Sequence, residues 1–257
     1  MSVVYQHFRP EEKEFIDQVV EWREYVDRTY AAKLTDFLDP RQQFILSALL
    51  GENNEVCYQF FGGAENSERK RAYIYPGYFE LKDEDFQIGL YEVDYPRKFI
   101  QLDHRMVLGS IMSLGLKRDK FGDIRKSGDR IQFFMAEEVE SYIFLELNQI
   151  GKAKVTIQKQ ADDPISSDEQ WRESEKTVSS LRLDVILAAA YNISRQKSQN
   201  LIQQGLIKVN WEKVEQTAFE CMASDVLSVR GMGRCKIIEI QGKTKKDRWR
   251  IKVGLLK

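Results

Sequence analysis

The residues of this chain best suited to chemistry lie in one short segment, "SRQKSQNLIQQGLIKVN", which runs from Ser194 to Asn210. Its Arg, Lys, Gln and Asn side chains precede a glycine stop and a short β run. On a helix, Arg195, Gln199 and Gln203 form one row at a spacing of four residues. A cation in the first helical turn is unfavourable in isolation, and a phosphate bound at that helix N-terminus reverses the sign of the effect. The segment therefore predicts contact with a polyanion.

Basic charge is concentrated at the C-terminal end. Residues 179–257 hold fifteen Lys and Arg against seven Asp and Glu, a net charge of +8, whereas residues 1–178 hold 24 against 33, a net charge of −9. This split predicts a basic binding module joined to an acidic domain, and the alternative is a chance difference between two solvated surfaces. We prefer the first interpretation, because +8 is a large imbalance for a domain with no polyanion to meet.

Other basic residues of this module occupy predicted strand ends and turns, as far as the Lys-rich turn at 243–246. Side chains in such places reach a phosphate backbone without disturbing a core. The residues predicted to bind RNA are Arg182, Ser194, Arg195, Lys197, Gln199, Gln203, Lys208, Asn210, Arg230, Arg234 and Lys236.

The chain offers little to catalysis or metal binding. Arg182-Leu183-Asp184 is similar to the sequence around the catalytic Asp of pseudouridine synthases, but the helix face "VILAAA" follows it in place of a Gly- and Ser-rich turn. His104 has no partnered nucleophile in the sequence, and "RGMGR" predicts a turn rather than a nucleotide site. Three distant cysteines and two histidines fit no disulfide framework and no zinc spacing. We expect no catalytic residue, no metal, no cofactor and no small-molecule substrate.

Composition places the chain among soluble globular proteins of one or two domains, with 257 residues, 42% of them hydrophobic and 31% charged. No apolar run approaches the ~18 residues that a membrane span needs, and the N-terminus lacks the features of a signal peptide. We therefore expect a reduced, cytoplasmic, monomeric protein with no membrane partner.

Periodicity predicts helices over 10–30 and 41–51, followed by strands and helices over 55–158 that would form an α+β sheet with helices on one face. The strand "RKRAYIY" places Arg71, Tyr73 and Tyr75 on one face. If exposed, that face would stack on bases, and otherwise its tyrosines pack under a helix. With the basic turn after Leu116 it gives a second predicted RNA surface, made of Arg71, Tyr73, Tyr75, Lys117, Arg118 and Lys120.

The C-terminal residues resemble the αL-type RNA-binding domain known as S4. The matching positions are Arg182-Leu183-Asp184, Ser194-Arg195, Gly205, Val209-Asn210 and Arg230 to Arg234. Two positions depart from the pattern. Ser198 replaces a small apolar residue, and Trp211 stands where Gly is common, so the turn there is expected to differ and to offer an aromatic surface.

The preceding region extends the resemblance. "FFGGAENSERKRAYIYP" and "HRMVLGSIMSLGLKRDKFGDI" resemble the YlmH family, bacterial proteins with an RNA-recognition-like fold before an S4 domain. The similarity covers nearly the whole chain. It implies binding to ribosomal RNA on the large subunit, a part in handling stalled nascent chains with peptidyl-tRNA (ribosome-associated quality control), and an association with cell division.

We therefore predict an α+β protein that binds RNA without catalysis. Its parts are an N-terminal helical region over 1–52, an RNA-recognition-like domain over 53–159, an acidic linker over 160–178 and an S4-type domain over 179–257. The alternatives are an RNA-modifying enzyme anchored by its S4 domain and a helix-turn-helix protein that binds DNA. Whether the N-terminal part binds RNA or protein is left open.

Overall fold

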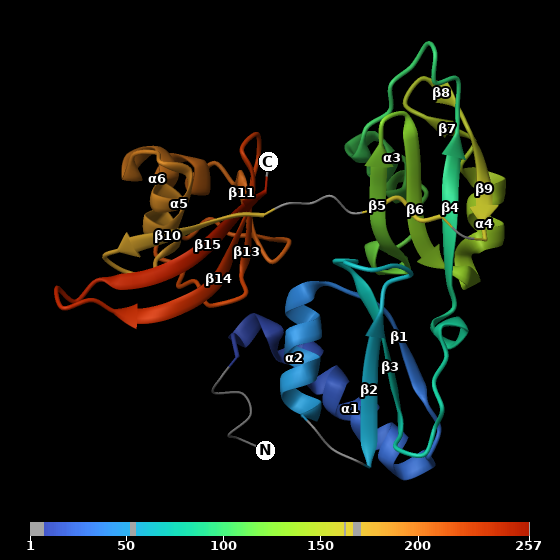
Figure 1. The fold of residues 1–257 in the computed structure, drawn as a ribbon, viewed down its shortest axis with the longest axis horizontal. Coiled ribbons are helices and arrows are strands. Elements are labelled where there is room, and N and C mark those ends of the chain that lie inside the picture. The colour runs from blue at the N-terminus through green and yellow to red at the C-terminus, as the bar shows by residue number, and fades with distance from the viewer. Residues whose placement is uncertain (1–7, 52–54, 162, 167–170, 257) are drawn as a thin grey trace. The chain divides into compact units, whose positions relative to one another are not determined.

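The structure is a computed structural model, and it describes residues 8–51, 55–161, 163–166 and 171–256. The chain forms two compact units, residues 1–167 and residues 168–257 (Figure 1). In the described part of the chain, no helix is long and apolar enough to cross a membrane. No group of three or more His, Cys, Asp and Glu residues in that part could hold a metal ion.

The first half of unit 1 packs two helices on a small sheet. Short turn η2 (Pro10–Glu12) leads into α1 (Lys13–Thr29), and Asp39 caps α2 (Pro40–Leu50) by accepting hydrogen bonds from the backbone N–H groups of Arg41 and Gln42. The antiparallel sheet has the order β1 (Lys33–Leu38), β3 (Lys70–Pro76), β2 (Val56–Phe61). Apolar side chains of both helices bury one face of the sheet, around Val19, Leu46, Ala72 and Ile74.

The second half of unit 1 has the strand–helix–strand–strand–helix–strand order of RNA-recognition folds. In chain order its elements are η3 (Asp83–Phe86), β4 (Ile88–Asp94), α3 (His104–Ser113), η4 (Arg118–Lys120), β5 (Phe121–Ser127), β6 (Arg130–Ala136), η5 (Glu137–Val139), α4 (Glu140–Glu146), the hairpin β7 (Gln149–Ile150) and β8 (Ala153–Lys154), and β9 (Thr156–Gln160). The antiparallel sheet runs β5-β6-β4-β9, and α3 and α4 cover one face around Tyr91, Ile111 and Phe133.

Buried arginines join the two halves of unit 1. The Arg69 guanidinium donates to the carbonyl oxygens of Phe37 and Phe121, so it bridges β1 and β5. Arg71 is 4% exposed and donates to the carbonyl oxygen of Thr35 at 2.7 Å and to that of Phe86 at 3.1 Å. These bonds satisfy buried carbonyl groups that the sheets leave unpaired, so the arginines stabilise the junction.

Unit 2 packs two helices on a six-stranded antiparallel sheet. The helices are α5 (Leu183–Tyr191) and α6 (Arg195–Gln203), and Gly205 ends α6 in the left-handed region at φ 65°. The sheet order is β10 (Arg172–Val178), β15 (Trp249–Leu256), β14 (Gly233–Lys243), β13 (Val226–Val229), β11 (Ile207–Val209) and β12 (Glu212–Lys213). One sheet face is buried against both helices around Leu183, Ile202 and Ile251.

Two predicted boundaries differ from the structure. Strands β2 and β3 pair with β1, so a boundary at residue 52 would divide a sheet, and the RNA-recognition-like fold begins with β4. The predicted linker over 160–178 contains β10, whose seven residues pair with β15 although its polar sequence carries no apolar alternation. Residues 162 and 167–170 of that segment lie outside the described residues. The described residues 160–161 and 163–166 of the segment lie in unit 1.

Sequence patterns missed several strands and misplaced one helix end. Besides β10, the strands β1 and β5 were not predicted, because "KLTDFL" and "FGDIRKS" mix charges with apolar residues without regular alternation. The pattern "AEEVESYIFLELNQI" predicts a helix that ends at Gly151, but Gly151 does not end α4. That helix ends at Glu146, and Gly151 lies in the turn between β7 and β8.

Candidate nucleic-acid interface

A buried carboxylate organises the helix pair of unit 2. Asp184, in the first turn of α5, has no exposed side-chain area. It accepts hydrogen bonds from Arg182 at 3.1 Å, Arg195 at 2.8 Å and Gln199 at 2.9 Å. The two arginine side chains remain 39% and 54% exposed. Asp184 therefore fixes two cations and an amide that still face solvent, as a surface for phosphate groups requires.

The charge state of Asp184 follows from its partners. Burial raises its pKa, and the hydrogen bonds from Arg182, Gln199 and Arg195 outweigh that effect, so its pKa lies below its ordinary value. The carboxylate is thus ionised at neutral pH and is fully engaged by these side chains. Asp184 thereby orients its basic neighbours Arg182 and Arg195.

The start of α6 presents the remaining predicted groups of this helix. The Ser194 hydroxyl accepts a hydrogen bond from the Lys197 backbone N–H at 3.2 Å and so caps the helix. The side chains of Lys197 and Gln203 are exposed. In the described residues Lys197 has no ion pair, so its charge is available to a ligand. Ser194 stabilises the start of α6 as its N-cap, because its hydroxyl oxygen accepts the Lys197 hydrogen bond.

In the turn after β11, the Asn210 side chain forms hydrogen bonds within the protein. Asn210 donates to the Asp225 carboxylate at 2.8 Å and accepts from the Val226 backbone N–H at 2.9 Å. This disfavours the predicted contact of Asn210 with RNA, because the amide is used to fix the turn. Both Asn210 and Trp211 have positive φ, 48° and 68°, as a two-residue hairpin turn demands. Gly adopts a positive φ without strain, so the usual Gly at position 211 would give the same turn. The turn therefore differs from the S4 pattern in its residue, Trp211, and not in its hairpin geometry.

Three predicted cations lie on the other face of the sheet. Ile207, Leu227 and Cys235 are buried toward the helices, so the alternate residues point away from them. These alternate residues include Lys208, Arg234 and Lys236, and Lys208 is in register with Ser228, which is in register with Arg234. Arg230 is exposed in the turn between β13 and β14. The predicted RNA-binding residues therefore divide between two faces of unit 2, and only the helix-side group has a common organising contact.

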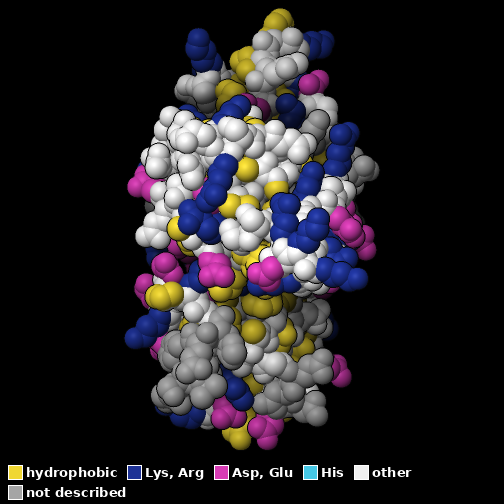
Figure 2. All heavy atoms as spheres, turned by 90° about the vertical axis from the view of Figure 1, so that its left-hand side faces the viewer, with side chains coloured by type: hydrophobic (Ala, Val, Ile, Leu, Met, Phe, Trp, Pro, Cys, Tyr) yellow, Lys and Arg dark blue, Asp and Glu magenta, His cyan; other side chains and the backbone are white. Residues whose placement is uncertain are grey.

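Figure 2 views unit 2 from the side on which α5, α6 and the β14–β15 turn lie in Figure 1. Lys and Arg side chains stand there among uncharged surface, and Asp and Glu side chains lie on several sides of them. This distribution suits an extended anionic ligand, because single cations at intervals can each meet a phosphate.

The second predicted RNA surface, in unit 1, loses most of its cations. Arg71 is buried in carbonyl contacts, as described above. The Arg118 guanidinium donates to the backbone oxygens of Phe121 and Gly122, and burial lowers its pKa to about 10. Lys120 forms ion pairs with Asp36 and Glu138. Each of these three side chains is committed to a contact within the protein, which disfavours the predicted contact with RNA. Lys117 is exposed.

The two tyrosines of that surface belong to an aromatic cluster. Ala72 and Ile74 face the helices, so Tyr73 and Tyr75 lie on the opposite face of the first sheet. The Tyr73 ring stacks on Phe79 with 5.7 Å between centroids, and the Tyr75 ring lies 5.9 Å from that of Phe79. Both tyrosines are half-buried, and the Tyr73 ring also lies 5.8 Å from that of Phe86 in η3. Neighbouring η3 carries three acidic residues, which disfavour RNA at this face.

The comparisons with known proteins agree with this architecture. Residues 82–163 match a family model described as "Putative RNA-binding domain in YlmH", and residues 181–227 match the S4 domain. The chain is 46% identical over 254 residues, 98% of both chains, to the Ribosome-associated protein quality control protein P2 of Bacillus subtilis. The chain described here therefore belongs to the YlmH family. A solved structure, the cell division protein ylmH from Streptococcus pneumoniae, is 33% identical with a TM-score of 0.52, over 61% of this chain and 94% of that one.

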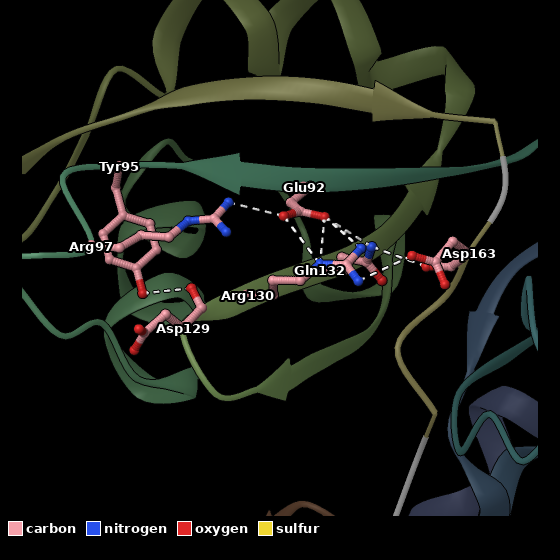
Figure 3. A network of polar contacts seen from close by, with 7 residues as sticks. All are labelled: Glu92, Tyr95, Arg97, Asp129, Arg130, Gln132 and Asp163. Carbon is pink, nitrogen blue, oxygen red and sulfur yellow. Dashed lines mark hydrogen bonds and ion pairs between the residues drawn. The ribbon is translucent and has the colours of Figure 1, made fainter.

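The YlmH-type RNA-binding domain has an unusual sheet surface here. RNA-recognition folds stack bases on aromatic residues of their two central strands. On the corresponding face of β4 and β6, Glu92 instead accepts hydrogen bonds from Arg97 at 2.9 Å, Arg130 at 2.9 Å and Gln132 at 3.1 Å (Figure 3). The hydrogen bonds from Arg130 in particular lower the pKa of Glu92. Phe134 of the same face is buried against Phe37.

The chain after β9 also covers part of this face. Gln132 accepts a hydrogen bond from the Ile165 backbone N–H at 2.7 Å and donates to the Asp163 carbonyl oxygen, while Arg125 donates to the Ile165 carbonyl oxygen at 2.9 Å. Side chains and segment together occupy the positions where bases would stack. The sheet of this YlmH domain therefore lacks the aromatic platform of RNA-recognition folds among its described residues, although its topology is the same.

The predicted RNA-binding residues leave out the Lys-rich turn between β14 and β15. Its lysines were noted as basic, but the predicted set of RNA-binding residues stopped at Lys236. The signal that could have included them is the density of charge, since five of the eight residues from Lys243 to Arg250 are Lys or Arg and only Asp247 is acidic.

Proposed function

We propose that this protein binds structured RNA of the large ribosomal subunit through the helix side of unit 2 and takes part, without catalysis, in ribosome-associated quality control. The observation that carries the proposal is the buried Asp184, which holds Arg182, Arg195 and Gln199 at the surface of an S4 domain. Guanidinium groups fixed in this way can meet successive phosphates. The ribosomal role rests on the family and on the name of the Bacillus subtilis relative.

A catalytic role for Asp184 is disfavoured by its surroundings. The carboxylate has no exposed area, and all its described polar contacts go to side chains of the protein itself. A nucleophile or general base must reach the substrate. We therefore propose that the S4 domain binds RNA and does not anchor a modifying enzyme. Contact with peptidyl-tRNA and a monomeric, cytoplasmic state are parts of the same proposal, and the name of the Streptococcus pneumoniae protein suggests a link to cell division.

The test measures binding of the full chain to isolated large ribosomal subunits and to a stem–loop RNA. Arg182→Ala with Arg195→Ala should weaken binding to both by about tenfold or more, because each arginine supplies about one phosphate contact. The control Arg23→Ala removes an exposed cation from α1 in unit 1 and should bind as the unchanged protein does. Duplex DNA of equal length should compete poorly. Unchanged affinity in the folded double variant, or stronger competition by duplex DNA, would contradict the proposal.

A further inference from the structure

The β14–β15 turn lies on the same side of unit 2 as the Asp184 cluster. Trp249 is in register with Val178, which is buried toward the helices, and Lys243 is in register with Trp249. Residues in register point to the same face of a sheet, so Lys243 and Trp249 project toward the helix side. Lys208, Arg234 and Lys236 point to the opposite face, as described above.

The turn also lies at the same end of unit 2 as Arg182. Val178 pairs with Trp249, and only residues 179–181 separate Val178 from Arg182. Four chain steps span at most about 15 Å. The Arg248 guanidinium donates to the Thr177 carbonyl oxygen at 3.1 Å, which ties the turn to the end of β10 directly. The turn and Arg182 can therefore contact neighbouring phosphates of one RNA.

The turn is held in a defined conformation. The Thr244 backbone N–H donates to the Arg248 carbonyl oxygen at 2.7 Å, and the Thr244 hydroxyl accepts from the Arg248 backbone N–H at 3.2 Å. The Lys243 ammonium lies 5.2 Å from the centre of the Trp249 ring and 2.8 Å from the Asp247 carboxylate. Lys243 is thus used within the turn, and its charge is partly neutralised.

Lys245 and Lys246 differ from Lys243 in having no such partner. Both are exposed, and among the described residues neither forms an ion pair. Two exposed ammonium groups on adjacent residues of a fixed turn concentrate positive charge at one point of the surface, and that charge attracts an anion. A preformed turn loses little conformational freedom on binding, so little of the attraction between its charges and the anion is offset by an entropy cost.

We infer that the β14–β15 turn is a second phosphate-binding element, in which Lys245 and Lys246 contact the backbone of the RNA that Arg182 and Arg195 bind. The ligand class is the sugar–phosphate backbone, read by charge and not by base sequence. The inference rests on the proposed function, since it extends that interface beyond the residues matched by the S4 model, 181–227. The turn would lengthen the bound stretch of RNA and thus favour helical RNA over short single strands.

The experiment uses the full chain, a stem–loop RNA and a salt series. Lys245→Gln with Lys246→Gln should weaken binding by about 5- to 50-fold at low salt and make the slope of log K against log salt shallower by about 1 to 2. The matched control is Lys152→Gln with Lys154→Gln. These residues belong to the β7–β8 hairpin of unit 1, are exposed, and have no ion pair among the described residues. The control changes the net charge by the same amount and should leave affinity within about twofold.

Comparing the turn variant, the double arginine variant and the unit 1 control tests this inference separately from the proposed function. If the turn variant binds as the unchanged protein does, while Arg182→Ala with Arg195→Ala binds weakly, the turn is not an RNA-binding element and the proposed function stands. If only the turn variant is weakened, the turn is supported and the Asp184 interface is misassigned. Equal weakening in the unit 1 control would attribute the effect to net charge and overturn the inference. Circular dichroism checks that each variant is folded.

Discussion

At the residue scale, Asp184 links stability to pH. Its pKa is lowered because hydrogen bonds from Arg182, Gln199 and Arg195 outweigh the effect of burial. A carboxylate with a lowered pKa in the folded state stabilises that state fully above its ordinary pKa of 3.8, and the contribution is lost as the pH falls through the folded pKa. Acid should therefore loosen the α5–α6 pair.

Asp184→Asn keeps the shape of the side chain and removes its charge. We expect the free energy of unfolding of this variant at pH 7 to be about 1–3 kcal/mol lower than that of the unchanged protein. Between pH 5 and pH 3, the free energy of unfolding should fall less in the variant than in the unchanged protein. Urea unfolding followed by tryptophan fluorescence measures this, because three of the four Trp residues, Trp171, Trp211 and Trp249, lie in unit 2. Parallel pH curves for the two proteins would show that Asp184 is not ionised in the described contacts.

Ser198 leaves a buried hydroxyl without a hydrogen bond. It lies in α6 with no exposed area, and its Oγ has no partner among the described residues. An unsatisfied buried polar group costs about 1–3 kcal/mol, so Ser198→Ala should raise the free energy of unfolding by about 1 kcal/mol. The comparison variant Ser194→Ala removes the N-cap and should lower it by about the same amount. A lower stability for Ser198→Ala would mean that the hydroxyl has a partner.

At the element scale, β10 completes the sheet of unit 2. Its seven residues pair with β15 along their whole length, and Val178 is 1% exposed. A fragment over residues 171–257 should fold alone and bind RNA, whereas a fragment over 179–257 loses this edge strand and exposes β15. We expect the shorter fragment to melt at a clearly lower temperature or to aggregate. Thermal unfolding by circular dichroism compares them, and equal melting temperatures would show that β10 does not stabilise the unit.

At the scale of the whole molecule, the charge of the two units differs in sign. Unit 2, residues 168–257, holds 17 Lys and Arg against 11 Asp and Glu, a net charge of +6, which leaves 22 against 29 and a net charge of −7 for residues 1–167. Acidic unit 1 should repel RNA in bulk, and its three buried or paired cations cannot offset this. Any help it gives to binding must come from a surface of the ribosome that fits it.

The full chain and the fragment over 171–257 test this division. On a stem–loop RNA the fragment should bind at least as tightly as the full chain, because it lacks the acidic unit. On intact large ribosomal subunits the full chain should bind more tightly, because a subunit surface that fits unit 1 adds contacts that the fragment lacks. Binding curves for the four combinations at one salt concentration give the result. The same ratio of affinities in both constructs would show that unit 1 contributes nothing to target choice.

The sequence by itself determined the local chemistry of unit 2. The glycine stop after α6 and the polar row that contains Arg195 and Gln199 were predicted, and the structure has both. Capping and helical spacing depend on a few neighbouring residues, so a linear pattern contains the information. The charge split and the family resemblance are likewise properties of the linear chain.

Only the tertiary structure decided which cations face solvent. Arg71, Arg118 and Lys120 look like surface residues in a basic segment, but carbonyl oxygens and carboxylates from distant segments surround them, such as those of Thr35 and Asp36. Strand β10 has a polar sequence and exists because β15 supplies its hydrogen-bond partners. Such contacts join residues far apart in the sequence, and their free energy depends on burial and on partners that no local pattern records. The position of the Lys-rich turn beside Arg182 was decided in the same way, by the register of β10, β15 and β14.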